Sequence, residues 1–378
     1  MKTFSEYKNS YTCRSIKESA PRYTLFPKDK GELKQMINDE IDKHGLGVDL
    51  NHIDVSRITD FSELFKWSEF HGDISRWDVS NATDMSKMFL TCREFDCDIS
   101  GWDVSNVTNM QGMFCNAKLF DQDLSGWDVS KVTNMSEMFH DASNFNGDIS
   151  TWDVRNVTSM KEMFRNSLQF DGNLKRWNTK NVEDMEGMFY GAESFNQDIS
   201  RWNVSNVINM KEMFRNCSKF NADLSGWDVS NVTNMYEMFC GCKKFNQDIS
   251  KWNVSKATNM SYMFSNCESF NQSLSGWDVS NVADMKWMFY DCKSFNGNIS
   301  GWNIKAIDMS FMFRECLSFN QDISGWNVSN VKDMRGMFSH CTSFKQNLSG
   351  WDVSNVRQHS DMFYKCPCPK KYQPKFES

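Results

Sequence analysis

Cysteine recurs in register along this 378-residue chain, and its thiol can bind a soft metal, act as a nucleophile or form a disulfide. Eight of the 13 cysteines stand three residues after a Met-Phe pair: Cys92, Cys217, Cys242, Cys267, Cys292, Cys316, Cys341 and Cys366. Other repeats hold Ala117, Ala142, Ser167 or Ala192 there. A position that accepts Cys, Ala or Ser requires a small buried side chain, and a straight file of thiols cannot surround a tetrahedral ion. We therefore predict free, structural cysteines, which are typical of a reducing compartment.

Aspartate also recurs in register, and a stacked file of carboxylates is one pattern expected of a calcium site. The file consists of Asp73, Asp98, Asp123, Asp148, Asp198, Asp223, Asp248 and Asp322, and other repeats hold Asn173, Ser273, Asn298 or Asn347. Asp, Asn and Ser all accept hydrogen bonds from turn amides, so we favour turn capping over calcium binding. A second file is expected to bond backbone groups between repeats: Asn81, Asn106, Asn156, Asn181, Asn206, Asn231, Asn281, Asn330 and Asn355.

Catalytic motifs are absent from the sequence. It contains no G-x-S-x-G, no phosphate-binding P-loop and no H-E-x-x-H. The six histidines share no position of the repeat, and we interpret them as single solvated side chains: His44, His52, His71, His140, His340 and His359. The sequence thus predicts a protein that is not an enzyme and that has no cofactor and no metal.

Charge and hydropathy exclude two classes of partner. The net charge is -7, so a basic groove for nucleic acid is not expected. No stretch approaches the roughly 20 apolar residues of a membrane helix, so membrane insertion is not expected either. The N-terminal 30 residues have no apolar core of a secretory signal. We expect an intracellular protein, or one of a virion or cell surface if a leader has been removed.

Tryptophan marks an internal repeat. Trp77 to Trp302 recur every 25 residues, and Trp326 and Trp351 follow after 24 and 25. The short step results from one residue lost between Ile304 and Asp308. A fixed period of this size is the signature of a solenoid, in which each repeat buries its apolar face against its neighbours.

Each repeat is expected to contain two short elements. Around Trp127, Val132, Met135, Met138, Phe139, Ala142 and Phe145 are apolar at spacings of three and four, which predicts a short helix over 132–145. Residues 148–154 alternate apolar and polar, which predicts a short strand. The predicted fold is an α/β repeat in a single stack, with one short strand and one short helix per 25-residue turn.

The predicted organisation has four parts. Residues 1–28 are a polar extension, and 29–52 form an N-terminal capping helix and lead-in, with Leu33, Met36, Ile37 and Ile41 on one helical face and Gly45 as its stop. Residues 53–366 form a solenoid of about 13 repeats. Residues 367–378 are a Pro- and Lys-rich tail that ends the stack.

The repeat unit resembles that of a known family. The unit M-F-x-x-C-x-x-F-N-Q-D-I-S-x-W-D-V-S-N-V-T-N-M is similar to the repeat of BspA-like leucine-rich-repeat surface proteins. It looks more narrowly like the domain-of-unknown-function repeat of mycoplasma surface lipoproteins, found also in algae and large DNA viruses. The resemblance covers about residues 49–366 and implies a leucine-rich-repeat-like solenoid used for binding, with no catalytic residues to carry over.

A candidate binding surface lies at positions that the core leaves free. Two residues past the first Met of each predicted helix, three consecutive repeats hold aromatic side chains, and two tyrosines lie nearby. The resulting candidate site consists of Tyr236, Tyr262, Trp287, Tyr290 and Phe311. Contiguous exposed apolar surface usually marks an interface, so we expect a protein-binding or scaffold protein, whose partner is another protein or a second copy. A carbohydrate-binding surface or adhesion protein that uses the same aromatic residues is the alternative.

Overall fold

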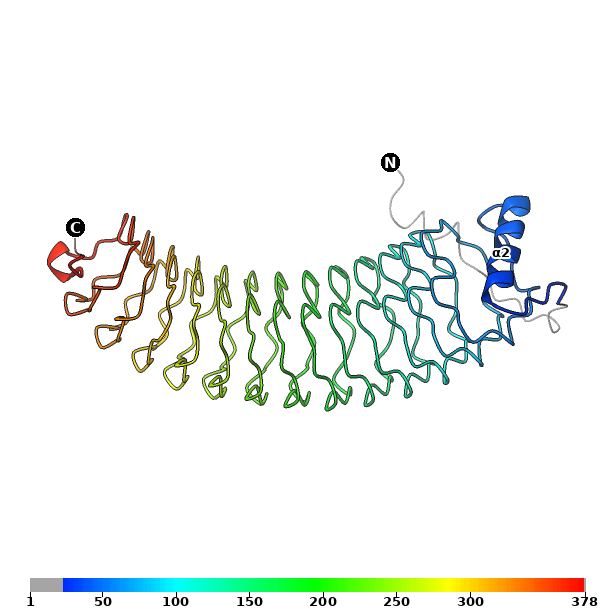
Figure 1. Ribbon diagram of the computed structural model, residues 1–378, viewed down its shortest axis with the longest axis horizontal. Helices are drawn as coiled ribbons and strands as arrows, with labels where there is room; N and C mark the ends of the chain where they lie inside the picture. The colour runs from blue at the N-terminus through cyan, green and yellow to red at the C-terminus, as the bar shows by residue number, and fades with distance from the viewer. Residues whose placement is uncertain (1–22, 377–378) are drawn as a thin grey trace. The chain divides into compact units, whose positions relative to one another are not determined.

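The structure is a computed structural model that describes residues 23–376. The described chain consists of a helix near its start and a series of 25-residue repeats, each of which forms one turn of a solenoid (Figure 1). It divides into two compact units, residues 1–181 and 182–378, each a stack of such repeats. Most of the predicted polar extension, residues 1–22, lies outside the described residues, as do 377–378 of the tail.

Helix α2, Lys30–His44, stands at the start of the first unit (Figure 1). The Asp29 side chain accepts a hydrogen bond from the Glu32 amide at its N-terminus, and Gly45 ends it with a φ of 86°. Leu33 and Ile37 are buried. The Lys30 ammonium lies 3.2 Å from the Asp60 carboxylate, and the Lys34 ammonium donates to the Leu64 carbonyl. The helix therefore packs on the first repeat.

The prediction of a helix and a strand in each repeat was wrong. Among residues 23–376, the helices are α2 and a 3₁₀ turn, η1, at Lys370–Tyr372. Within the predicted helix of residues 132–145, residues 135–142 form consecutive β-turns, in which the amides of Met138, His140 and Ala142 donate to the carbonyls of the third residue back: Met135, Glu137 and Phe139. Such turns also bring residues three and four apart to one face, so their apolar spacing imitates that of a helix. We call residues 135–142 and their equivalents the turn segment.

Neighbouring repeats are joined through the remaining amides of the turn segment. The Glu137, Phe139 and Asp141 amides donate to carbonyls of the next repeat at 2.7–2.9 Å. Parallel bridges of single residues precede each turn segment, as at Asn109↔Asn134 in the first unit and Asn234↔Asn259 in the second. The predicted strand over 148–154 is absent, because that stretch is occupied by a turn in which the Trp152 amide bonds the Ile149 carbonyl. Hydrogen bonding along the stack is therefore concentrated in the turn segments.

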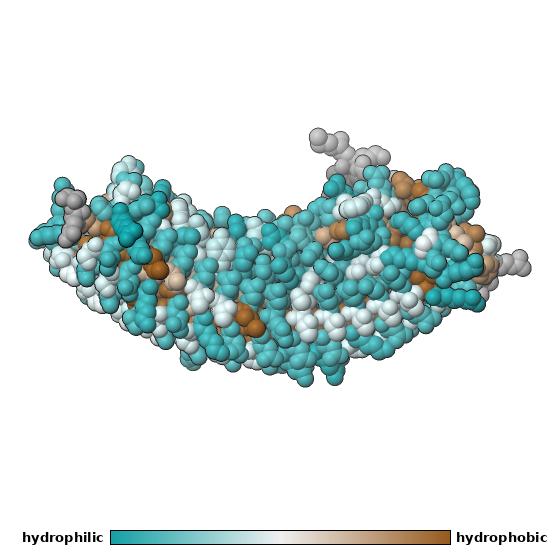
Figure 2. All heavy atoms as spheres, in the orientation of Figure 1, coloured by the Kyte–Doolittle hydropathy of each residue, from teal (hydrophilic) through white to brown (hydrophobic). Residues whose placement is uncertain are grey.

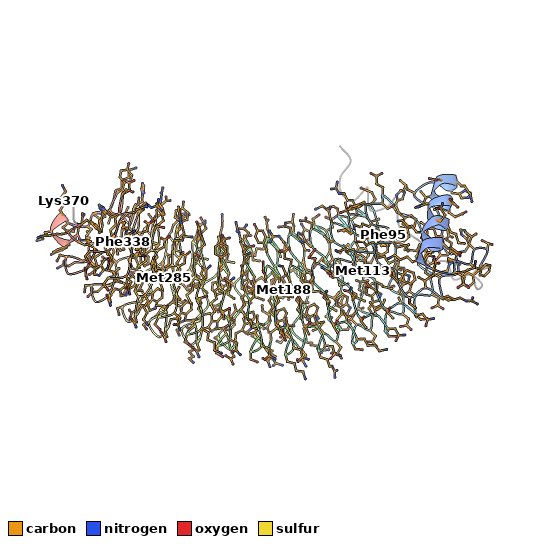
Figure 3. The ribbon with its side chains drawn as sticks, viewed as in Figure 1. Phe95, Met113, Met188, Met285, Phe338 and Lys370 are labelled. Atoms are coloured by element: carbon orange, nitrogen blue, oxygen red, sulfur yellow. The ribbon has the colours of Figure 1, made fainter. Side chains whose placement is uncertain are left out.

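In the core of each unit, equivalent side chains of successive repeats stack in columns. Figure 3 labels Phe95 and Met113, two core residues of the first unit. Phe114 and Phe139 stack with ring centroids 5.6 Å apart, and the two phenyl rings are fully buried. Each repeat tryptophan is 2–5 % exposed. The indole N–H of Trp252, for example, donates to the Leu224 carbonyl at 3.0 Å. The predicted burial of the tryptophans is confirmed, and each indole also satisfies a buried carbonyl.

The small-residue column behaves as predicted. Cys217, Cys242 and Cys267 are fully buried and free, and each thiol donates to a phenylalanine carbonyl 28 residues earlier at 2.8–2.9 Å. Ser167 makes the same bond to Phe139 with its hydroxyl at 2.6 Å. Because burial raises the pKa of these thiols well above its usual value, they are neutral and unreactive.

The aspartate and asparagine columns satisfy backbone groups, also as predicted. The Asp148 carboxylate accepts from the Ser150 amide at 2.8 Å, and Asn173 and Asn298 accept from the residue two positions on at 3.1 and 3.0 Å. In the second column, the Asn231 side-chain amide donates to the Ser205 carbonyl of the preceding repeat at 2.7 Å. These side chains therefore make hydrogen bonds that close the turns and join neighbouring repeats.

The surface on the face shown in Figure 2 is mostly hydrophilic, with small separate apolar patches. In the part of the chain that the structure describes, no helix could span a lipid bilayer; α2, with 15 residues, is the longest. In the tail, Pro374 is buried, and the Leu348 amide donates to the Tyr372 carbonyl at 2.7 Å.

Candidate functional site

Two backbone positions in each turn segment have a positive φ, and their side chains leave the core. The first left-handed position is the third residue of the segment, and the second lies four residues later. In the repeat of Trp127 these are Glu137, with φ 59°, and Asp141, with φ 57°. Each closes a β-turn of the type that requires φ > 0 at its third residue. Because the backbone there is set by hydrogen bonds to the next repeat, the side chain is free to vary without altering the core.

Three of the predicted site residues occupy this first left-handed position on consecutive repeats of the second unit: Tyr262, Trp287 and Phe311. Their φ angles are 58–59°. A bulky L-residue in this region costs roughly 1–2 kcal/mol relative to its preferred backbone. Other repeats place Gly112, Gly187 or Gly336 there, which adopt the same φ without that cost. The aromatic side chains are therefore not what the fold requires at this position.

The five predicted residues lie together, and we call Tyr236, Tyr262, Trp287, Tyr290 and Phe311 the aromatic column. The rings of Tyr262 and Trp287 are parallel within 4° with centroids 5.8 Å apart, and those of Trp287 and Phe311 are 4.4 Å apart. Tyr236 meets Tyr262 edge to face at 5.9 Å, and Tyr290 meets Trp287 edge to face at 4.8 Å. All five are half-buried, because each covers part of its neighbour. The sequence predicted an exposed patch, and the structure gives its five members intermediate burial.

The start of the aromatic column is charged. Tyr236 precedes Glu237, whose side chain is 7 % exposed and forms an ion pair with Arg215. Burial, followed by a hydrogen bond to the Glu237 carboxylate, raises the pKa of Tyr236 well above its usual value. The Tyr236 hydroxyl therefore stays protonated at neutral pH. Along the column, the Lys286 ammonium lies 3.0 Å from the Asp284 carboxylate.

At its other end the aromatic column opens onto a hollow of about 190 Å³. Its lining is Phe311, Arg314, Gly336, Ser339, His340, Asp361 and Tyr364. The next repeat has Gly336 at the first left-handed position, and a Cβ built there would lie 2.5 Å from the Phe311 ring. The Arg314 guanidinium stands over the Phe311 ring at 5.9 Å from its centroid, and the His340 and Tyr364 rings meet edge to face at 5.3 Å. The stack of rings thus ends at a position without a side chain.

Sequence reasoning missed the lining of the hollow and the left-handed backbone. A signal for the latter was present: at the second left-handed position most repeats hold Asn, Asp or Gly, the residues that tolerate φ > 0. It also missed a cluster in the first unit, where Cys115, Glu137 and His140 bring ligand atoms within 4.8 Å of one another. His140 was expected to be solvated, but its side chain is only 20 % exposed.

The solved structures to which the chain is similar include three leucine-rich-repeat proteins of bacteria. A leucine-rich-repeat protein from Eubacterium ventriosum is 13 % identical to this chain, with a TM-score of 0.39. The match covers 79 % of this chain and 84 % of the other protein's chain. A leucine-rich-repeat protein of Leptospira interrogans is 9 % identical with a TM-score of 0.27, covering 89 % and 88 %. A leucine-rich cell surface protein from Faecalibacterium prausnitzii is 11 % identical with a TM-score of 0.28, covering 70 % and 76 %. No curated protein matches the chain.

One family model matches nearly the whole repeat region. It is described as a mycoplasma protein of unknown function, DUF285, and it matches four overlapping stretches: residues 32–149, 122–227, 208–308 and 275–373. These matches begin in helix α2 and run through every repeat described above. The chain is therefore a member of the DUF285 family, built as a solenoid of 25-residue repeats.

Proposed function

We propose that this protein is a non-enzymatic scaffold that binds another protein through the aromatic column. The observation that carries the proposal is the occupation of three consecutive left-handed positions by Tyr262, Trp287 and Phe311. Aromatic side chains are the commonest anchors of protein interfaces, since each buries a large area at a small cost in conformational entropy. A binding role gives these rings a reason to stand where glycine is easier to accommodate.

The geometry of the rings favours a protein over a carbohydrate. Sugars bind aromatic residues by lying on an open ring face. Here Tyr262, Trp287 and Phe311 stack face to face along the solenoid, so their faces cover one another and their edges point outward. Ring edges and the half-buried tyrosine hydroxyls suit the side chains and backbone of a polypeptide.

The partner is proposed to insert an aromatic side chain into the hollow beside Phe311. That ring ends the stack, and Gly336 leaves the following position without a side chain. A volume of about 190 Å³ accommodates one aromatic ring. Arg314 and Asp361 line the same hollow and can bond the backbone flanking the inserted residue. The partner would thereby continue the stack by one ring.

Selection from a displayed peptide library against the full-length chain tests this function. We expect the enriched peptides to share an aromatic residue. Their affinity should fall about 10–100-fold for Phe311→Ser and for Trp287→Ser, the size of a binding hot spot. Leu317→Ser is the matched control, because Leu317 is 40 % exposed in the same unit but lies outside the aromatic column; its affinity should be unchanged.

Three results would contradict the proposal. Enriched peptides that lack an aromatic residue, or that bind Phe311→Ser as tightly as the unmodified chain, would remove the aromatic column as the site. Binding to a glycan array that is lost in Trp287→Ser would assign the column to carbohydrate. Concentration-dependent dimers in sedimentation velocity, abolished by Phe311→Ser, would make the occupant a second copy of the chain.

A further inference from the structure

We propose that Cys115, Glu137 and His140, in the first unit, bind a divalent transition-metal ion of the zinc type, with water as the fourth ligand. One ligand atom from each of the first three residues lies within 4.8 Å of the other two. Sulfur, imidazole nitrogen and carboxylate oxygen are together the donor set that proteins use for zinc. This site is independent of the aromatic column and of its proposed partner.

Two neighbouring repeats supply the ligands from fixed backbone positions. Glu137 and His140 are the first and last residues of one β-turn, closed by the His140 amide and the Glu137 carbonyl at 3.0 Å. Cys115 occupies the position equivalent to His140 in the preceding repeat, and the Asn116 amide joins the two repeats by donating to the His140 carbonyl at 2.6 Å. In that repeat the position equivalent to Glu137 is Gly112, which has no side chain to separate the thiol from the carboxylate.

The imidazole of His140 is oriented for coordination. Its Nε2 lies 3.6 Å from the Asp141 carboxylate, the kind of outer partner that fixes a ligating histidine. Its Nδ1 lies 3.3 Å from Glu162 Oε2 but has no contact with solvent and no hydrogen-bond partner among the described residues. His140 therefore offers a buried ring nitrogen that makes no hydrogen bond among the described residues. The second Glu162 oxygen is 3.7 Å from Arg165, which leaves Oε2 turned toward the imidazole.

This cluster differs from the buried cysteine column, whose thiols already donate to carbonyls and stand in one straight file. Cys115 belongs to a different position of the repeat and is half-buried. Its companions come from two positions of the next repeat, so the donors surround a point rather than forming a line.

An equivalent turn in the second unit provides a matched control. Glu237 and Cys240 have the spacing of Glu137 and His140, but there the Glu237 carboxylate pairs with Arg215, and Cys240 is followed in the next repeat by Ser265. The Arg215 guanidinium thus already pairs with the carboxylate of this turn, and Cys240 stands where His140 would supply an imidazole. Cys240→Ser should therefore leave metal binding unchanged.

The test is titration of the full-length, tag-free, chelator-treated chain with Co²⁺ and Zn²⁺, followed by absorbance and calorimetry. We expect one Co²⁺ per chain with a thiolate-to-cobalt charge-transfer band, displaced by Zn²⁺. Cys115→Ser should abolish that band, and His140→Asn should weaken binding by about 100-fold or more, since even outer partners of a ligand cost about 10–100-fold. Circular dichroism should show that both variants remain folded.

The proposal is overturned by either of two results. One is the absence of stoichiometric Co²⁺ and Zn²⁺ binding to the folded chain. The other is an unchanged charge-transfer band in Cys115→Ser, or its loss in Cys240→Ser, which would place the metal elsewhere.

Discussion

The ring of Trp287 lies against that of Phe311 in the next repeat, with centroids 4.4 Å apart, although the backbone at both residues is left-handed. Each repeat has two such positions, and their φ is imposed by turns whose alternate amides bond the neighbouring repeat. The core determines the side chains between these positions. The left-handed positions themselves are therefore where repeats can differ without a change of fold.

Glycine should matter at the left-handed positions, because its backbone adopts a positive φ without strain. Gly112→Ala places a Cβ where φ is 59°, and we expect the free energy of unfolding to fall by about 1 kcal/mol. The nearest atom to the new Cβ is the flexible Lys87 Cγ at 3.3 Å, so steric conflict adds little. Urea denaturation measures the change. Gly101→Ala is the control, because its φ is not positive and its Cβ would have no neighbour within 4 Å; a loss as large as that of Gly112→Ala would contradict the argument.

The sequence predicted the repeat, the buried columns and the turn caps, since each of these is set by residue type at a fixed position. Cys217, Asp148 and Asn231 have the environments expected of them. It did not predict the turn segment, because turns that close over three residues produce the same apolar spacing as a helix. The turn segment could have been predicted from Asn116, Asp141 and Gly191, because these residue types tolerate the positive φ of the second left-handed position that they share.

The sites were predictable only in part. The aromatic column is visible in the sequence because Tyr262, Trp287 and Phe311 interrupt a column of glycine and charged residues. The cluster of Cys115, Glu137 and His140 was not, because its members come from different positions of two repeats. Which of these positions are adjacent depends on the turn geometry, which the spacing of apolar residues does not reveal.

The indole hydrogen bonds should contribute to stability beyond the packing of the rings. Trp252→Phe keeps an aromatic ring but removes the indole donor at 3.0 Å, so the Leu224 carbonyl keeps only its bond from the Trp227 amide at 3.1 Å. A lost hydrogen bond of this kind costs about 0.5–1.5 kcal/mol, and the lost volume adds to this. We expect the urea midpoint to fall accordingly. Trp67→Phe, at a side chain that is 72 % exposed, should change the free energy of unfolding by less than about 0.5 kcal/mol. Equal effects of the two changes would refute the role of the bond.

Stability should decrease in acid through the aspartate column. Hydrogen bonds from the Ser150 amide and hydroxyl lower the pKa of Asp148, and the Ser250 hydroxyl and amide do the same for Asp248. A folded pKa below the unfolded value of about 3.9 stabilises the protein above that value and loses its effect as the pH falls through the folded pKa. The urea midpoint should therefore begin to drop as the pH falls below about 5 and should keep dropping through the lowered pKa values of the folded protein.

Asparagine substitution separates this effect from general acid denaturation. Asn173 and Asn298 already accept the same turn amide without a charge. Asp148→Asn combined with Asp248→Asn and Asp322→Asn should retain most of the stability at pH 7 and flatten the decrease in acid. An unchanged pH profile would show that other carboxylates control it.

The cysteines of the repeats should label only when the chain unfolds. Burial raises the pKa of Cys217, Cys242 and Cys267, and that of the half-buried Cys240 to about 11. In a Cys13→Ser background, an alkylating reagent at pH 7.5 should modify these thiols at a rate that rises with urea in parallel with unfolding. Fast labelling of Cys217 in the native protein would contradict its position in the core.

The central claim is that side chains at the left-handed positions serve binding and not folding. The direct measurement is the double variant Trp287→Gly with Phe311→Gly, assayed for urea unfolding and for affinity to a selected peptide. Glycine adopts the positive φ without strain, which offsets part of the stability lost with the ring contacts. We therefore expect the free energy of unfolding to change by less than about 2 kcal/mol. Binding of the peptide should be lost. The core substitution Phe289→Ala should cost about 3–5 kcal/mol by comparison. A double variant destabilised as much as Phe289→Ala, or one that still binds, would contradict the account.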